Sequence, residues 1–159
     1  MKRIISLLVA LVMLCALPLH AQARTAEYFK LIPSNNRMSS EGRFIINCYS
    51  NYRTDSNFIA THYTIPLTVS AQVYNQDPNT PPKDADNIYY TIELYKVGIP
   101  DRIGWYTHAA NGETGSTNFT VSIGSEYYLK IVITGNLGSW EYVYGEGDIS
   151  NMYIVPKRD

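Results

Sequence analysis

Apolar and polar residues alternate along most of the chain, and this alternation predicts β-strands. The clearest case is residues 64–74, where every odd-numbered residue is apolar and most even-numbered residues are polar or aromatic. A period of two is that of a strand with one buried face, and no long stretch shows the 3.6-residue period of an amphipathic helix. The residues expected to face the core are Ile65, Leu67, Val69, Ala71 and Val73.

Similar runs, separated by turn residues, predict the other strands. The expected turns are at Asn111–Gly112 and at Gly145, Gly147 and Asp148, and residues 75–87, which contain three prolines, are expected to form a long exposed loop. Short strands that each have one apolar face favour an all-β fold: a single antiparallel β-sandwich of about 7–9 strands, immunoglobulin-like or jelly-roll-like. The expected strands are 25–32, 44–52, 64–74, 89–97, 103–109, 117–123, 127–134, 140–144 and 152–155.

The N-terminal segment has the three parts of a secretory signal peptide. Lys2 and Arg3 make the start positive, residues 4–17 are almost entirely apolar, and small residues stand at the two positions that a signal peptidase reads before a cut after Ala23. We therefore predict that residues 1–23 are a cleaved signal peptide.

Two other uses of this segment fit less well. The apolar run is shorter than the ~20 residues that a membrane-spanning helix needs. A lipid anchor on Cys15 is disfavoured, because Met13 and Leu14 precede it where lipoprotein signals have small residues. We expect a bacterial protein that is secreted to the extracellular space, with cell-wall association left open, and whose mature residues 24–159 form one domain.

The charge of the mature domain excludes two classes of partner. Without Lys2 and Arg3 it has eleven basic and fourteen acidic side chains, a net charge of −3. Nucleic acids and anionic membranes are bound by clustered Lys and Arg, and no such cluster is present in the sequence. We expect no nucleic-acid partner and no stable membrane insertion; the oligomeric state is left open.

No catalytic or cofactor-binding motif is visible. The glycines occur singly at turns, and the sequence has no phosphate-binding loop, GxSxG elbow or HExxH motif. His62 and His108 are expected to be polar surface residues. Cys48 shares strand parity with Phe44 and Ile46, so we expect it to be buried; a reactive thiol paired with a histidine is the alternative. The interpretation is a non-enzymatic protein without cofactor or metal.

Calcium is the metal for which the sequence offers candidate ligands. Carboxylate and amide oxygens occur in the long loop and near the C-terminus, but their spacing does not match an EF-hand loop. A solvated acidic loop is therefore the preferred interpretation. The candidate ligands are Asp77, Asp84, Asp86, Asn87, Glu146 and Asp148.

Tyrosine is unusually frequent, with 14 Tyr against 4 Phe, and several aromatic residues fall in patterns. Trp140, Tyr142 and Tyr144 share one side of an expected strand. They could form an exposed platform that stacks on sugars or anchors a protein, or they could be core residues. The core interpretation is preferred because Val143 is too small to fill the core on its own side. The candidate ligand-binding residues are Trp105, Tyr106, Trp140, Tyr142 and Tyr144.

The stretch from Tyr89 to Thr134 contains YTIELYKVG, an aromatic strand around Trp105, and FTVSIGSEYYLKIVI. In strand texture it resembles the small, secreted immunoglobulin-like proteins of Gram-positive gut anaerobes. The resemblance covers about a third of the chain. It implies a β-sandwich and an extracellular location, and it implies no functional residues.

Three functional hypotheses follow. The first is a non-catalytic binding module that recognises a glycan or a protein through an aromatic-rich sheet face and the loops near Trp105 and Trp140. The alternative is a cell-surface structural or assembly protein that pairs through an edge strand, for which residues 44–52 are the candidate. The third, a small secreted enzyme or inhibitor, has no supporting motif.

Overall fold

The computed structural model describes residues 26–33, 40–76, 80–83 and 85–155, so the expected signal peptide lies outside the described residues. None of the described residues lies in a helix, and this part of the chain therefore contains no helix long and apolar enough to cross a membrane. The predicted all-β class is confirmed. The strands are β1 Tyr28–Pro33, β2 Glu41–Cys48, β3 Tyr52–Arg53, β4 Asn57–Ala60, β5 Thr64–Asn75, β6 Ala85–Lys96, β7 Arg102–Thr120, β8 Glu126–Thr134, β9 Glu141–Ser150 and β10 Met152–Val155.

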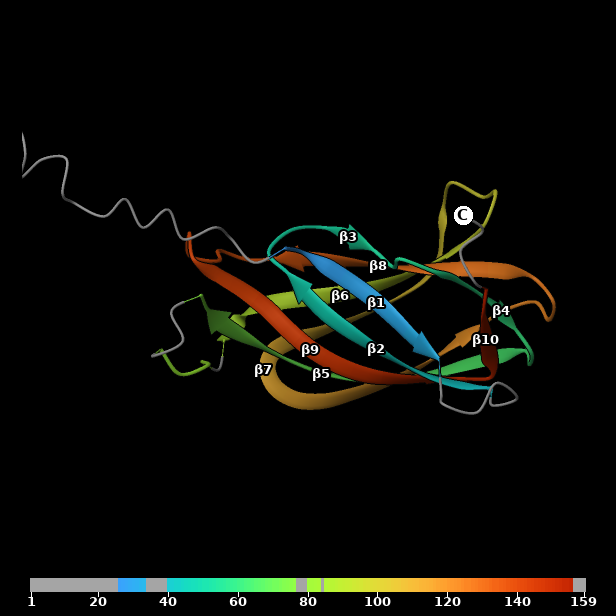
Figure 1. Ribbon diagram of the computed structural model, residues 1–159, viewed down its shortest axis with the longest axis horizontal. Helices are drawn as coiled ribbons and strands as arrows, with labels where there is room; N and C mark the ends of the chain where they lie inside the picture. The colour runs from blue at the N-terminus through green and yellow to red at the C-terminus, as the bar shows by residue number, and fades with distance from the viewer. Residues whose placement is uncertain (1–25, 34–39, 77–79, 84, 156–159) are drawn as a thin grey trace, which may run out of the picture.

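The strands form two antiparallel sheets that share β7. Sheet A has the order β1-β2-β9-β5-β7, in which β5 pairs with the C-terminal half of β7. Sheet B has the order β7-β6-β8-β4-β10, begins with the N-terminal half of β7, and adds β3 beside β8. Figure 1 shows β1, β2 and β9 side by side in the near layer, with β6 and β8 behind them. The predicted antiparallel β-sandwich is confirmed.

One apolar core lies between the two sheets. The alternation predicted for residues 64–74 is confirmed, because the side chains of the five odd-numbered residues between 65 and 73 are each at most 2% exposed. Sheet B contributes the opposite half of the core from β4, β6 and β8. The largest fully buried side chains are Phe29, Phe44, Ile46, Phe58, Ile65, Leu67, Ile88, Tyr90, Ile92, Leu94, Tyr127 and Leu129.

Strand β7 does not turn where the sequence predicted a turn. Gly112 has a φ of +83°, and the pairing register of β5 and β7 shifts at this point, between Ser70 and Gln72. The Glu113 N–H donates to the Asn111 side-chain oxygen at 3.1 Å. These features are those of a β-bulge, which bends a strand without reversing it. The bend carries β7 from sheet B into sheet A, as its curved path in Figure 1 shows.

The turn predicted at Gly145, Gly147 and Asp148 is also wrong, because β9 continues through all three residues. Both glycines face the core, where a Cβ on Gly147 would overlap the Phe44 ring and the Thr68 carbonyl oxygen. Phe44 in turn packs edge-to-face on Phe29, with the ring centroids 5.6 Å apart. The glycines are therefore selected for space rather than for a turn.

The candidate edge strand is not an edge. β2, which covers most of the segment proposed for intermolecular pairing, lies between β1 and β9. The edge of sheet A is β1, and part of that edge is already occupied: Leu31 N–H donates to Asp55 Oδ1, and the Asp55 N–H donates to the Phe29 carbonyl, both at 3.0 Å. The prediction of an open edge is therefore wrong for residues 44–48, because β2 is paired with β1 on one side and with β9 on the other.

Substituting Gly147 with alanine should lower the free energy of unfolding by about 1–3 kcal/mol, because the added methyl group collides with the Phe44 ring and with backbone. Urea denaturation of the mature domain measures the change. Gly138→Ala is the matched control, since its Cβ meets only the flexible Glu141 side chain, and it should change stability by less than about 0.5 kcal/mol. Equal stabilities of the two variants would show that a methyl group fits on the inner side of β9 at position 147 and would contradict the close packing described here.

Candidate binding site on the outer face of sheet A

The outer side of β9 carries two aromatic residues followed by two acidic residues. Val143 is fully buried on the inner side of the strand, so the residues that alternate with it face outward. The preferred core interpretation of the aromatic stripe is therefore wrong for this strand. The aromatic residues face outward because residues of β2 and β5 fill the inner side of β9 at Gly145 and Gly147 and leave no room for a side chain there. The outward residues are Tyr142, Tyr144, Glu146 and Asp148.

Four tyrosines from three strands gather at one end of this face. Tyr74 of β5 is paired with Tyr142, and their rings stack with centroids 5.9 Å apart; Tyr144 meets Tyr74 edge-to-face at 5.7 Å. Burial, followed by the nearby hydroxyls of Tyr74 and Tyr28, raises the pKa of Tyr142. We call Tyr28, Tyr74, Tyr142 and Tyr144 the tyrosine cluster; each of the four is half-buried, so part of every side chain reaches solvent.

Glu146 connects the tyrosine cluster to a charged region. Its Oε1 accepts a hydrogen bond from the Tyr144 hydroxyl at 2.9 Å, and its Oε2 accepts one from the Arg43 guanidinium. Burial raises the pKa of Tyr144 to about 12, and the hydrogen bond to the Glu146 carboxylate acts in the same direction. Tyr144 therefore stays protonated at neutral pH and acts as a donor, while Glu146 is fixed as an acceptor between two donors.

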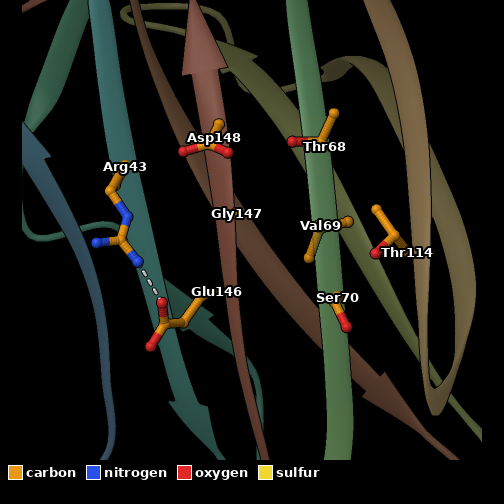
Figure 2. A pocket seen from close by; sticks show the side chains of 8 residues that line it. All are labelled: Arg43, Thr68, Val69, Ser70, Thr114, Glu146, Gly147 and Asp148. Carbon is orange, nitrogen blue, oxygen red and sulfur yellow. Dashed lines mark hydrogen bonds and ion pairs between the residues drawn. The ribbon is translucent and has the colours of Figure 1, made fainter.

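Beyond Glu146 the face is hollowed by a groove of about 210 Å³ (Figure 2). Figure 2 shows the side chains of Arg43 and Glu146 reaching toward each other across β2 and β9, with hydroxyl-bearing residues of β5 and β7 on the opposite side. Such a groove offers charged donors, charged acceptors and hydroxyl groups within one small volume. Its lining residues are Arg43, Thr68, Val69, Ser70, Thr114, Glu146, Gly147 and Asp148.

The tyrosine cluster and the groove form one continuous strip, which we call the β9 strip. Successive outward residues of a strand are about 6.8 Å apart, so the four from Tyr142 to Asp148 extend over roughly 20 Å. One end of the strip is aromatic and the other is polar. The order of the outward residues of β9 can be read from alternation in the sequence. Their partners on β2 and β5 cannot, because these strands come from distant parts of the sequence.

The five sequence-predicted residues do not form one surface. Tyr142 and Tyr144 lie together on the β9 strip, whereas Trp105 is 60% exposed on the outer face of sheet B, where it pairs with the outward residue Glu93. Tyr106 faces inward and packs against the core. Trp140 is 47% exposed and directly precedes β9. Its carbonyl oxygen accepts a hydrogen bond from the backbone N–H of Gln76, the residue that follows β5.

Cys48, His62 and His108, the residues considered for catalysis, have other side-chain or backbone partners and do not form a thiol–histidine pair. Cys48 is fully buried, as predicted, and its thiol donates to the Tyr28 carbonyl at 3.3 Å. Desolvation raises its pKa to about 12. His62 is exposed and hydrogen-bonds to its neighbour Thr61, whereas His108 is half-buried and stacks on Tyr90, so the surface position predicted for His108 is wrong.

Of the residues considered for calcium, the structure describes Asp86, Asn87, Glu146 and Asp148. Asp77 and Asp84 are outside the described residues. Among the residues that the structure does describe, no three His, Cys, Asp or Glu side chains are close enough together to hold a metal ion. Glu146 and Asp148 instead belong to the β9 strip, where Arg43 neutralises one of the two charges.

No protein-family model matches the chain, and neither does any curated protein. Solved structures that are similar include the periplasmic inhibitor PliG of g-type lysozyme from Aeromonas hydrophila, at 9% identity and a TM-score of 0.40, covering 80% of this chain and 98% of that one. Another is the CBM36-1 domain of a xylanase from the hindgut metagenome of Trinervitermes trinervoides, at 15% identity and a TM-score of 0.36, covering 80% and 88%.

A third is a carbohydrate-binding module of lichenase 5A from Cellvibrio mixtus in complex with cellotriose, at 12% identity and a TM-score of 0.28, covering 80% and 92%. Similarities at this level concern the arrangement of strands and assign no function to the chain. The resemblance to secreted immunoglobulin-like proteins of Gram-positive gut anaerobes stays a prediction.

The Cys48 thiol should be unreactive in the native protein. With a pKa of about 12, only about one thiol in ten thousand is ionised at pH 8, and the side chain has no access to solvent. Labelling with Ellman's reagent at pH 8 should therefore be complete in guanidinium chloride and nearly absent in buffer. Rapid labelling of the folded mature domain, which lacks Cys15, would contradict the burial described for Cys48.

Proposed function

We propose that the protein is a secreted, non-catalytic glycan-binding module, and that the β9 strip is its binding site. The observation that supports this is the order of groups along the strip: a cluster of tyrosines at one end and a groove with carboxylate, guanidinium and hydroxyl groups at the other. Both kinds of group stand on regular strands, so their spacing is fixed by the sheet.

The two ends of the strip suit the two kinds of surface that a sugar presents. The C–H faces of a pyranose ring are apolar and pack on aromatic rings, while its hydroxyl groups both donate and accept hydrogen bonds. Arg43 supplies donors, while Glu146 and Asp148 supply acceptors; the Tyr144 hydroxyl, whose proton is donated to Glu146, adds a further acceptor. Hydrogen bonds to charged groups are the stronger kind, so this end would contribute most of the selectivity among sugars.

The shape of the strip favours a chain of sugars over a single one. It extends over roughly 20 Å, is continuous along β9, and lies on an open sheet face rather than in an enclosed cavity. An extended ligand would lie along the strand direction and contact the tyrosine cluster and the groove at the same time. We therefore propose an oligosaccharide or polysaccharide as the ligand.

The arrangement of Glu146 favours binding over cleavage. Both carboxylate oxygens already accept hydrogen bonds, one from Tyr144 and one from Arg43. A carboxylate held between two donors is a fixed acceptor for the hydroxyl groups of a ligand. The proposal also places the module outside the cell, which rests on the predicted signal peptide at residues 1–23.

The test is a glycan array with the purified mature domain, followed by calorimetry on the best-binding oligosaccharide. Tyr142→Ala should weaken binding by about tenfold, because removing a ring that stacks on the ligand costs about 1.5 kcal/mol. Tyr153→Ala is the matched control: it is also a tyrosine on a strand, it is 50% exposed, and it lies on β10 of the other sheet.

The two variants separate a local effect from a general one. Tyr153→Ala should bind as the wild type does, and circular dichroism should show both variants folded. Absence of any glycan binding by the folded domain, or equal binding by the two variants, would reject the β9 strip as a glycan site.

A further inference from the structure

The outer face of sheet B, opposite the β9 strip, carries two basic residues that face each other. Arg53 of β3 is the direct cross-strand partner of Lys130 of β8. Leu129 and Ile131 are fully buried, so Lys130 points away from the core. Two like charges at directly opposed positions of antiparallel strands destabilise the sheet unless an opposite charge lies between them.

The carboxylate nearest to this pair along the register is already used. Glu93 of β6 is the cross-strand partner of Lys130, and it is only 7% exposed. Its Oε1 accepts a hydrogen bond from Arg102 at 2.6 Å, and its Oε2 accepts one from the Tyr95 hydroxyl at 2.9 Å. Among the described residues no ion pair joins a carboxylate to Arg53 or to Lys130.

Neutral groups hold Arg53 in place. Its guanidinium donates to the Asn57 amide oxygen at 2.7 Å and lies 3.7 Å from the centroid of the Tyr128 ring. Tyr128 is in turn stacked on Tyr95, with centroids 5.1 Å apart and planes within 6°. The guanidinium is therefore positioned by packing, and it keeps N–H donors and its full charge for a group from outside the chain.

An exposed ring lies in the same row. Trp105 of β7 is the cross-strand partner of Glu93, so the row across sheet B reads Arg53, Lys130, Glu93, Trp105. Strands are about 4.8 Å apart, which makes the row roughly 14 Å long. The indole is 60% exposed, and the Arg102 guanidinium lies 4.6 Å from its centroid.

We propose that this face is a second binding site, which takes an acidic polysaccharide. A carboxylate or sulfate group of the sugar chain lies between Arg53 and Lys130 and relieves their repulsion, and a neighbouring sugar ring packs on Trp105. A chain of acidic sugars supplies both a negative charge and an apolar ring face in each repeat, whereas an acidic peptide supplies only the charge. The site shares no residue with the β9 strip and stands independently of it.

Affinity electrophoresis and calorimetry at 20 mM salt test this with four polymers: polygalacturonate, dextran sulfate, neutral dextran and poly-glutamate. The mature domain should bind at least one of the two acidic polysaccharides. It should not bind neutral dextran at this face, and it should bind poly-glutamate much more weakly than the acidic polysaccharide. Preference between polygalacturonate and dextran sulfate identifies the anionic group. Binding to neither, or equal binding to poly-glutamate, overturns the proposal.

Single substitutions locate the site. Arg53→Gln and Lys130→Gln should each weaken binding of the acidic polysaccharide by about tenfold, the loss expected for one charge-assisted hydrogen bond. Lys83→Gln is the control, because it removes the same charge from an exposed residue elsewhere. If Lys83→Gln weakened binding of the acidic polysaccharide as much as Lys130→Gln does, binding would depend only on net charge, and the proposal would be overturned.

Two further readouts keep the result unambiguous. Without ligand, Lys130→Gln should have a melting temperature at least equal to that of the wild type, because it removes a like-charge contact; a clear loss of stability would contradict the repulsion on which the site depends. Tyr142→Ala should leave binding of the acidic polysaccharide unchanged. If it abolished that binding, the ligand would lie on the β9 strip and the second site would be rejected.

Discussion

The contact between the Phe44 ring and Gly147 is the constraint on which the outer face of sheet A depends. Phe44 leaves no room for a side chain at Gly147 on the inner side of β9, and Ser70 and Ala71 of β5 leave none at Gly145. Tyr142, Tyr144 and Glu146 alternate with these inner positions and face outward. A requirement of core packing thus produces the row of functional groups that we propose to bind a glycan.

The bulge at Gly112 has a comparable effect on the whole molecule. Because β7 bends without reversing, a single strand closes both sheets and leaves each with its own outer face. The two faces differ in chemistry. In the groove on sheet A the carboxylates of Glu146 and Asp148 outnumber the Arg43 guanidinium, while the row on sheet B contains Arg53, Lys130 and a Glu93 that is already paired with Arg102. Two different ligands are therefore the natural expectation.

Sequence patterns predicted the parts of the fold that depend on alternation alone. The buried side of β5 and the buried Cys48 followed from parity. The two wrong turn predictions came from glycine, since neither Gly112 nor Gly147 reveals in sequence whether it serves a turn, a bulge or a close contact. The partners of the candidate site were also hidden: Arg43 meets Glu146 only through the register of β2 and β9, strands about one hundred residues apart. For the same reason alternation could not tell that Trp105 and Tyr142 lie on opposite faces.

The most direct test of the account is an NMR titration of the isotope-labelled mature domain with the oligosaccharide that binds best. Backbone amide shifts report which face the ligand contacts without changing any residue. The largest changes should occur along Tyr142, Tyr144 and Glu146 and at their partners on β2 and β5. Changes confined to the turn at Trp140, or changes centred on sheet B for a neutral oligosaccharide, would contradict the central claim that the β9 strip is the glycan site.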